Sequence, residues 1–246
     1  MTGPRFYIID PPLREGTDVE LPERAARHAK VLRLAPGDPL VLFDGSGSEY
    51  PAVVSEARRH QFRVKVGDAV SGIAEPRLRL HLGIAVLKRD AMHAALQRAT
   101  ELGVAAITPL YTEYTDTPRG GAERRVANWT AVLASSAEQC GRATLPTLHE
   151  VQALSAALST PAELRVMAHP TAADPAGALG GTAPQAAPTD VFALVGPEGG
   201  FSTVEVDAAR AAGFKLVSLG PRILRAETVP AVLSALLQAA WGDLNS

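Results

Sequence analysis

Residues 194–202 read LVGPEGGFS, and residues 219–228 read LGPRILRAET. Each stretch is the end of an apolar run followed by a glycine-proline turn, and the residues between them carry helix signals. Ser202 and Glu205 have the spacing of a capping box, and Gly213 suits the end of that helix because glycine accepts a positive φ. Such βα units bind ligands beyond the carboxyl ends of their strands. The two loops are therefore expected at one edge of a sheet.

The chain around these loops alternates between predicted strands and helices. Apolar residues indicate strands at 78–86, 105–111 and 164–168, and helical spacing indicates helices at 90–102, 122–140 and 229–241. Asp90 is the expected N-cap of the first of these helices. Strands that alternate with helices predict a parallel sheet. Residues 171–189 are rich in Ala, Pro and Gly, which predicts a long surface connection.

The first seventy residues have a different pattern. Short alternating strands at 39–43, 50–54 and 62–66, with one helix at 22–29, predict a small antiparallel barrel or sandwich. The glycine-rich turn at 44–48 is predicted to close a hairpin, because Glu49, Tyr50 and Pro51 cannot open a helix after it. The pattern changes near residues 71–76. We therefore predict two domains, residues 1–72 and 73–246.

Composition excludes several classes of protein. A single cysteine, Cys140, excludes an internal disulfide and any multi-cysteine metal site, and His169 has no metal-ligating partner spaced along a helix. We therefore expect no metal. We read Cys140 as a buried thiol, with a nucleophile as the alternative. The chain has no apolar stretch near the roughly 18 residues of a membrane span and no secretion signal at its start, which predicts a cytoplasmic protein.

The formal net charge of −2 argues against a strongly basic coat but leaves room for a local basic face. Arg24, Arg27, Lys30 and Arg33 recur every third residue. They indicate either a solvated helix face or a set of phosphate contacts.

No Walker loop and no Gly-x-Ser-x-Gly elbow occurs. The two opening loops resemble the carboxyl-terminal signature of the SPOUT superfamily, and they are most similar to those of the bacterial 16S rRNA uridine N3-methyltransferases. The resemblance continues through KRD at 88–90, QRATELG at 97–103 and EQCGR at 138–142. HAKVLRL at 28–34 and LFDG at 42–45 resemble that family's PUA-like domain. Arg89 and Ala226 depart from the family pattern, which usually has glycine and threonine there.

The resemblance implies an α/β trefoil-knot methyltransferase domain with a mostly parallel sheet, preceded by a small PUA-like β-barrel. It implies S-adenosylmethionine as the cofactor, a homodimer, and N3-methylation of one uridine of 16S rRNA in the small ribosomal subunit, number 1498 in standard bacterial numbering. The expected cofactor-binding residues are Leu194, Val195, Gly196, Pro197, Glu198, Gly199, Gly200, Leu219, Gly220, Ile223, Leu224 and Arg225.

Methylation at N3 removes a proton from the base, so the site needs a cation near the uracil oxygens and a proton acceptor. Arg225 is the first candidate cation and Arg222 the second; Glu138, Glu227 or a water is the candidate base. Glu227 could instead favour a helix dipole, and Glu138 could instead pair with Arg142 at helical spacing. The expected RNA-binding residues are Arg24, Arg27, Lys30, Arg33, Lys88, Arg89, Arg124, Arg142 and Arg222.

Three alternatives stay open on the sequence alone. The first is a SPOUT methyltransferase that acts on another RNA, such as tRNA. The second is a non-catalytic RNA-binding factor in ribosome assembly. The third is a metabolite-binding α/β domain, against which the barrel-like amino-terminal module argues.

Overall fold

The structure is a computed structural model that describes residues 3–58, 61–118, 120–172, 174 and 187–245. It contains two compact units. The first combines Met1–Glu75 with Ala134–Leu145, and the second combines Pro76–Leu133 with Pro146–Ser246. The domain boundary between residues 72 and 73 stays a prediction.

The first unit is built around a six-stranded sheet. Its elements are β1 (Arg5–Tyr7), β2 (Asp18–Glu20), α1 (Glu23–Val31), β3 (Pro39–Phe43), β4 (Ser48–Ala57), β5 (Phe62–Val66) and β6 (Val70–Ser71). The strand order is β1-β3-β4-β5-β2, with β6 beside β4. Only β1 and β3 pair in parallel, and the other pairings are antiparallel. The small, mostly antiparallel β domain follows the prediction, and the helix is two residues longer at its end.

Alternating side chains fill the core of this unit. Phe62, Val64 and Val66 of β5 are buried, and they pack in one cluster with Ala25 and Ala29 of α1. A period of two on the strand and a four-residue step on the helix each produce one apolar face. The amphipathic pattern alone therefore accounts for this part of the fold.

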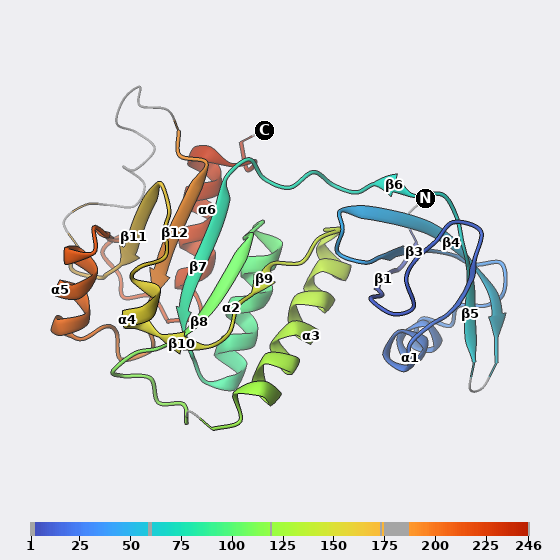
Figure 1. The fold of residues 1–246 in the computed structure, drawn as a ribbon, viewed down its shortest axis with the longest axis horizontal. Coiled ribbons are helices and arrows are strands. Elements are labelled where there is room, and N and C mark those ends of the chain that lie inside the picture. The colour runs from blue at the N-terminus through green and yellow to red at the C-terminus, as the bar shows by residue number, and fades with distance from the viewer. Residues whose placement is uncertain (1–2, 59–60, 119, 173, 175–186, 246) are drawn as a thin grey trace. The chain divides into compact units, whose positions relative to one another are not determined.

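The second unit contains a seven-stranded sheet in which all pairings are parallel (Figure 1). Its elements are β7 (Arg79–Ala85), α2 (Arg89–Glu101), β8 (Ala106–Tyr111), β9 (Thr147–Leu148), β10 (Gln152–Ala153), α4 (Leu154–Ala157), β11 (Leu164–Ala168), β12 (Asp190–Val195), α5 (Thr203–Ala211), β13 (Lys215–Val217) and α6 (Val229–Trp241). The helix α3 (Ala122–Cys140) belongs to both units, with residues 122–133 in the second and residues 134–140 in the first. The strand order is β10-β8-β7-β12-β11-β13, with β9 beside β8. The predicted parallel α/β sheet is confirmed.

The helix boundaries largely follow the sequence signals. Ser202 accepts a hydrogen bond from the Glu205 backbone at 3.3 Å, and the Glu205 carboxylate accepts one from the Ser202 backbone at 2.9 Å, so the capping box before α5 is confirmed. Gly213 follows that helix with a φ of 85°. Asp90, by contrast, is not an N-cap. The cap is Lys88, and Asp90 lies in the first turn of α2, where a carboxylate favours the helix dipole.

The elements β9, β10 and α4 were not predicted, because two to four residues are too few to display a period. Most of the predicted connection at 171–189 lies outside the described residues. None of the helices in the described residues combines the length and the apolar character that a membrane crossing requires.

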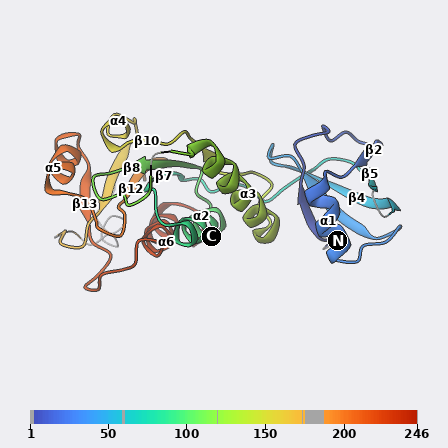
Figure 2. The ribbon, with the colours of Figure 1, turned by 90° about the horizontal axis from the view of Figure 1, so that it is seen from below.

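Strand order brings the two opening loops together. The strand β11 pairs with β12 on one side and with β13 on the other, so the three carboxyl ends are adjacent. Figure 2 shows α2 and α6 on one face of this sheet and α4 on the other. After β13 the chain must return to α6, which packs against α2 and β7. Residues 218–228 therefore cross the carboxyl ends of the strands.

Candidate functional site

A cavity of about 760 Å³ opens at the carboxyl ends of β11, β12 and β13. Four segments line it: Lys88 and Ala91 at the start of α2, residues 168–170 after β11, residues 196–201 after β12, and most of residues 219–229. Its size lies within the roughly 300–1,000 Å³ of small-molecule sites. The position is the one at which open α/β sheets bind ligands.

Glycines in the first loop are required by close packing. A Cβ atom built on Gly196 would lie 3.1 Å from the Phe201 ring, and one on Gly199 would lie 2.9 Å from the Cβ of Tyr114. The Pro197 carbonyl accepts a hydrogen bond from the backbone N–H of Gly200 at 2.9 Å, which closes the turn. The loop is consequently compact and fits closely against its neighbours.

Two other glycines leave backbone open to a ligand. Gly200 and Gly220 have φ values of 73° and 94°, and a Cβ atom on either would meet no atom within 4 Å. Both residues line the cavity. A side chain at either position would therefore occupy free space and strain the backbone. At these two positions the loops thus present backbone without a side chain in front of it.

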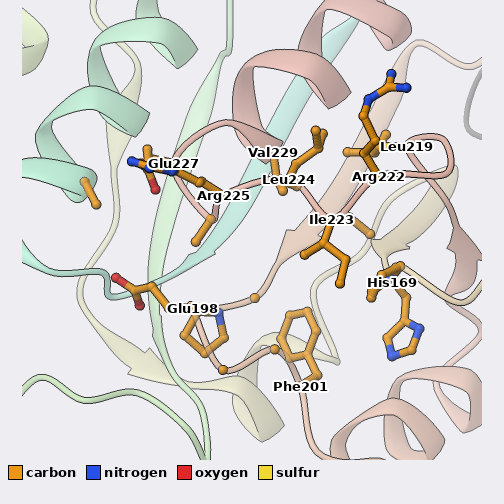
Figure 3. Close-up of a pocket in the computed structure, with 18 of the residues that line it drawn as sticks. His169, Glu198, Phe201, Leu219, Arg222, Ile223, Leu224, Arg225, Glu227 and Val229 are labelled. Carbon is orange, nitrogen blue, oxygen red and sulfur yellow. The ribbon is translucent and has the colours of Figure 1, made fainter.

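The second loop adds an apolar wall and a charged pair. Ile223 is 88% exposed and points into the cavity toward Phe201 (Figure 3). The Arg225 side chain is 84% exposed, and its guanidinium lies 4.0 Å from the Glu227 carboxylate, which is 22% exposed. Arg225 and Glu227 lie on the Glu198 side of the cavity (Figure 3). A cation and a carboxylate therefore stand together beside an apolar space.

Contacts from α2 hold both loops in place. Arg98 donates a hydrogen bond from Nη1 to the Glu227 carbonyl oxygen at 3.1 Å. The Lys88 backbone N–H is 3.4 Å from a carboxylate oxygen of Glu198, which is a long contact. The Lys88 ammonium lies 3.4 Å from the carboxylate of Asp116. The N-cap and the last turn of α2 thus each reach one loop of the cavity.

The structure brings together ten of the twelve residues expected to hold the cofactor. Leu194 and Val195 are fully buried in β12 and do not line the cavity. Leu194 packs in the core with Leu110 and Phe192. The ten that line it are Gly196, Pro197, Glu198, Gly199, Gly200, Leu219, Gly220, Ile223, Leu224 and Arg225.

Of the three candidate catalytic residues, Arg225 and Glu227 line the cavity and Glu138 does not. Glu138 lies in the first unit, where its carboxylate accepts a hydrogen bond from the Tyr7 backbone at 3.0 Å and lies 3.8 Å from Arg24. The structure therefore places Glu138 in a packing contact of the β domain.

The alternative ion pair between Glu138 and Arg142 is not formed. Gly141 takes a φ of 90° and ends α3, so Arg142 lies outside the helix and not one turn above Glu138. Arg142 is buried and pairs instead with Glu75 through both Nε, at 3.2 Å, and Nη2. Cys140, expected to be buried, is only partly buried.

Most of the residues expected to bind RNA are exposed. Arg27 forms a 2.6 Å ion pair with Glu23 along α1, and Arg33 follows the helix with a φ of 59°. Arg222 lines the cavity, and its side chain points away from Arg225 (Figure 3). The exposed members of the set are Arg24, Arg27, Lys30, Arg33, Lys88, Arg89, Arg124 and Arg222.

Sequence reasoning missed part of the lining. His169 and Pro170 follow β11, and Phe201 ends the first loop, yet none was assigned to the cofactor site. The available signal was the polar residue after the apolar strand at 164–168. To assign that residue to the cavity, one has to know that β11 lies between β12 and β13 in the sheet. No group of three or more potential metal ligands gathers among the residues that the structure describes.

Comparisons with known proteins agree with this geometry. The family described as RNA methyltransferase domain matches residues 74–238, and the family described as RNA methyltransferase PUA domain matches residues 21–67. The ribosomal RNA small subunit methyltransferase E of Buchnera aphidicola subsp. Schizaphis graminum is 30% identical over 220 residues, which cover 88% of this chain and 87% of that protein.

Two solved structures resemble nearly the whole chain. The crystal structure of a ribosomal RNA small subunit methyltransferase E from Neisseria gonorrhoeae, bound to S-adenosyl methionine, is 33% identical with a TM-score of 0.89. A Legionella pneumophila structure in complex with the bound cofactor SAM is 32% identical with a TM-score of 0.89. Each alignment covers 99% of this chain and 100% of the other.

Proposed function

Because this chain belongs to the ribosomal RNA small subunit methyltransferase E family, we propose that it methylates N3 of one uridine of 16S rRNA, using S-adenosylmethionine. The observation that carries the proposal is the cavity, in which open glycine backbone and an apolar wall lie next to Arg225 and Glu227. The chain spans most of the length of these relatives, so the proposal concerns the whole protein.

The residues of the cavity suit this cofactor. Gly200 and Gly220 leave room where a side chain would stand, so their backbone can approach an adenosine. Ile223, Leu219 and Leu224 offer an apolar surface for a purine ring. When bound, the cofactor supplies an electrophilic methyl group on a sulfonium. A cavity that is predominantly apolar with a few polar groups is typical of small-molecule sites.

Arg225 is assigned to stabilise negative charge on the uracil. N3 lies on the Watson–Crick edge, so the uridine must leave its stack before it can react. As N3 loses its proton, charge develops on the neighbouring carbonyl oxygens. The Arg225 guanidinium is permanently charged and largely exposed beside the cavity, so it can reach such an oxygen directly or after a rotamer change.

Glu227 is the candidate proton acceptor that the structure favours by position. Its carboxylate lines the cavity and lies 4.0 Å from Arg225, whereas Glu138 does not line the cavity. A water oriented by Glu227 would serve the same purpose. The Arg98 hydrogen bond to the Glu227 carbonyl keeps this carboxylate on the cavity side of the loop.

We further propose a homodimer in the cytoplasm. The support for the dimer is α6, in which Leu233 and Leu237 are buried while Val232 and Leu236 are only partly covered. A second copy could cover that apolar face. Sedimentation at micromolar concentration is expected to report twice the mass of 25.8 kDa, and a monomer there would refute the dimer.

Methyl transfer from labelled donor tests the proposed function. Purified small subunits and protein-free 16S rRNA are incubated separately with the protein, and the product nucleoside is identified after digestion. We expect 3-methyluridine at a single position. A different methylated nucleoside, or no transfer to either substrate, would overturn the proposal.

A matched pair of variants tests the role of Arg225. Arg225→Ala is expected to reduce the rate of methyl transfer by about a hundredfold or more, because a preorganised cation at developing charge contributes about 3 kcal/mol or more. Arg210→Ala removes the same side chain from α5, outside the cavity lining, so it should retain most of the rate. Full activity in Arg225→Ala would remove the assignment.

A further inference from the structure

A half-exposed aromatic residue stands beside the first loop, residues 196–201, which we call the donor loop because it is assigned to the methyl donor. Tyr114 lies in the connection between β8 and α3, and it is 49% exposed. It lies so close to Gly199 that a Cβ atom on that glycine would come within 2.9 Å of the tyrosine Cβ. Gly199 lines the cavity and Tyr114 itself does not. The tyrosine therefore stands at the rim, outside the space assigned to the cofactor.

The backbone that carries Tyr114 is held on both sides. The Thr112 N–H donates to the Thr115 hydroxyl at 3.0 Å, and the Thr115 N–H donates back to the Thr112 carbonyl at 3.3 Å. The Glu113 N–H donates to the Glu205 carboxylate at 2.8 Å. Glu205 also completes the capping box of α5 with Ser202, so the turn that carries Tyr114 and the end of the donor loop share one anchor.

The same connection also reaches α2. The Asp116 carboxylate lies 3.4 Å from the Lys88 ammonium, and Lys88 lines the cavity. Residues 112–116 consequently run along the rim from the donor loop to α2. Glu198, Arg225 and Glu227 lie together on one side of that cavity (Figure 3). An RNA segment that delivers a base to Arg225 from this side would pass along the rim.

A tyrosine that is half exposed on a hydrogen-bonded turn suits a stacking partner. Every nucleobase has a π-face, and stacking on an aromatic side chain contributes about 1–3 kcal/mol per base. A base taken out of its helix loses its own stacking and needs a replacement. The fixed backbone of Tyr114 means that little further order has to be imposed when a base arrives.

We propose that Tyr114 is an aromatic platform on which one nucleobase of the RNA substrate stacks as it enters the cavity. The inference rests on the proposed function, because it takes RNA as the substrate of this cavity. It assigns Tyr114 to binding the RNA and not to the chemical step. Because stacking neutralises no phosphate, the platform contributes nothing to the salt dependence of binding.

Four variants separate stacking from other roles. Tyr114→Phe keeps the ring, Tyr114→Leu keeps apolar bulk without a π-face, and Tyr114→Ala removes both. Val204→Ala is the matched control, since it removes an apolar side chain that is 75% exposed on α5. For each variant, KM for small subunits, kcat, RNA affinity by filter binding and donor affinity by calorimetry are measured.

We expect Tyr114→Phe and Val204→Ala to behave like the parent protein. Tyr114→Leu and Tyr114→Ala should weaken RNA binding and raise KM by about 5-fold to 150-fold, with an unchanged salt slope and unchanged donor affinity. Tyr114→Leu with normal RNA affinity would overturn the platform. A parallel loss of donor affinity would do so too, because it would show that Tyr114 only supports the donor loop.

The measurements also separate this inference from the proposed function. If the parent protein methylates 16S rRNA and Tyr114→Leu binds RNA normally, only the platform is refuted. If the parent transfers no methyl group but Tyr114→Leu still weakens RNA binding, only the proposed function is refuted. If the parent protein binds no RNA, both fail.

Discussion

Replacing Gly200 with alanine tests whether the open glycine backbone is the donor cradle. A Cβ atom at Gly200 would meet no protein atom within 4 Å, so the added methyl group would extend into free space at the cavity. A donor bound there would have to move away from it or tolerate the crowding. The substitution therefore acts on the bound ligand more than on the protein.

The expected size of the effect follows from two separate costs. The φ of 73° at Gly200 disfavours alanine by about 1–2 kcal/mol, partly offset by the lower entropy of the unfolded chain, which leaves about 0.5–1 kcal/mol of lost stability. One extra methyl in a packed interface costs about 1–3 kcal/mol. The Kd for S-adenosylmethionine should therefore rise by about 5-fold to 150-fold.

Gly121 provides the matched control. Its φ is 71°, its Cβ would also meet no atom within 4 Å, and it belongs to the same unit but does not line the cavity. Thermal unfolding should show a similar loss for Gly121→Ala and Gly200→Ala, while calorimetry should show weakened donor binding only for Gly200→Ala. Normal donor affinity in Gly200→Ala, or an equal loss in Gly121→Ala, would refute the cradle.

Three further substitutions test other contacts. Glu205→Ala removes a capping carboxylate that accepts two backbone hydrogen bonds, so it should lower the free energy of unfolding by about 2 kcal/mol and Tm by about 4–8 °C. The control Asp207→Ala, on the same helix, should change the free energy of unfolding by less than about 0.5 kcal/mol. Equal effects of the two substitutions would contradict this account. Arg98→Ala should slow methyl transfer about tenfold with unchanged donor affinity, because it releases the Glu227 carbonyl; an unchanged rate in a steady-state assay would count against that. Burial, and secondarily the nearby His149, lowers the pKa of His81 from 6.5 to about 4. As the pH drops from 6.5 toward 4, His81 is therefore protonated in the unfolded chain before it is protonated in the folded protein, and the free energy of unfolding falls. In His81→Gln, urea titrations across that range should show about 2–3 kcal/mol less acid destabilisation than in the parent.

Local pattern was sufficient for the elements around the site. The capping box at Ser202 and Glu205 and the stop at Gly213 depend only on neighbours in the chain, so the boundaries of α5 could be predicted closely. The same is true of α3 and α6, whose bounds coincide with the predicted ranges. The two glycine-proline loops, which supply most of the cavity lining, could be predicted from the same local signals.

Other features depended on contacts between distant segments. Glu138 was a candidate base because it belongs to a motif, but tertiary packing sets its carboxylate against Tyr7 and Arg24. The helix α3 ends before Gly141, so Arg142 lies outside it and forms a buried ion pair with Glu75 in place of the predicted pair with Glu138. A motif shows which residues are present, whereas their neighbours depend on how the chain returns on itself.

The sequence alone determined the class of the sheet, the two loops at its edge and the residues that form most of the cavity lining. These features come from apolar periodicity and turn chemistry, which act over a few residues. Only the tertiary structure decided that β11 lies between the two loops, that Arg98 holds Glu227, and that Tyr114 stands against Gly199. Strand order and side-chain contacts between segments far apart in the chain minimise the free energy of the whole chain, and no local window contains that information.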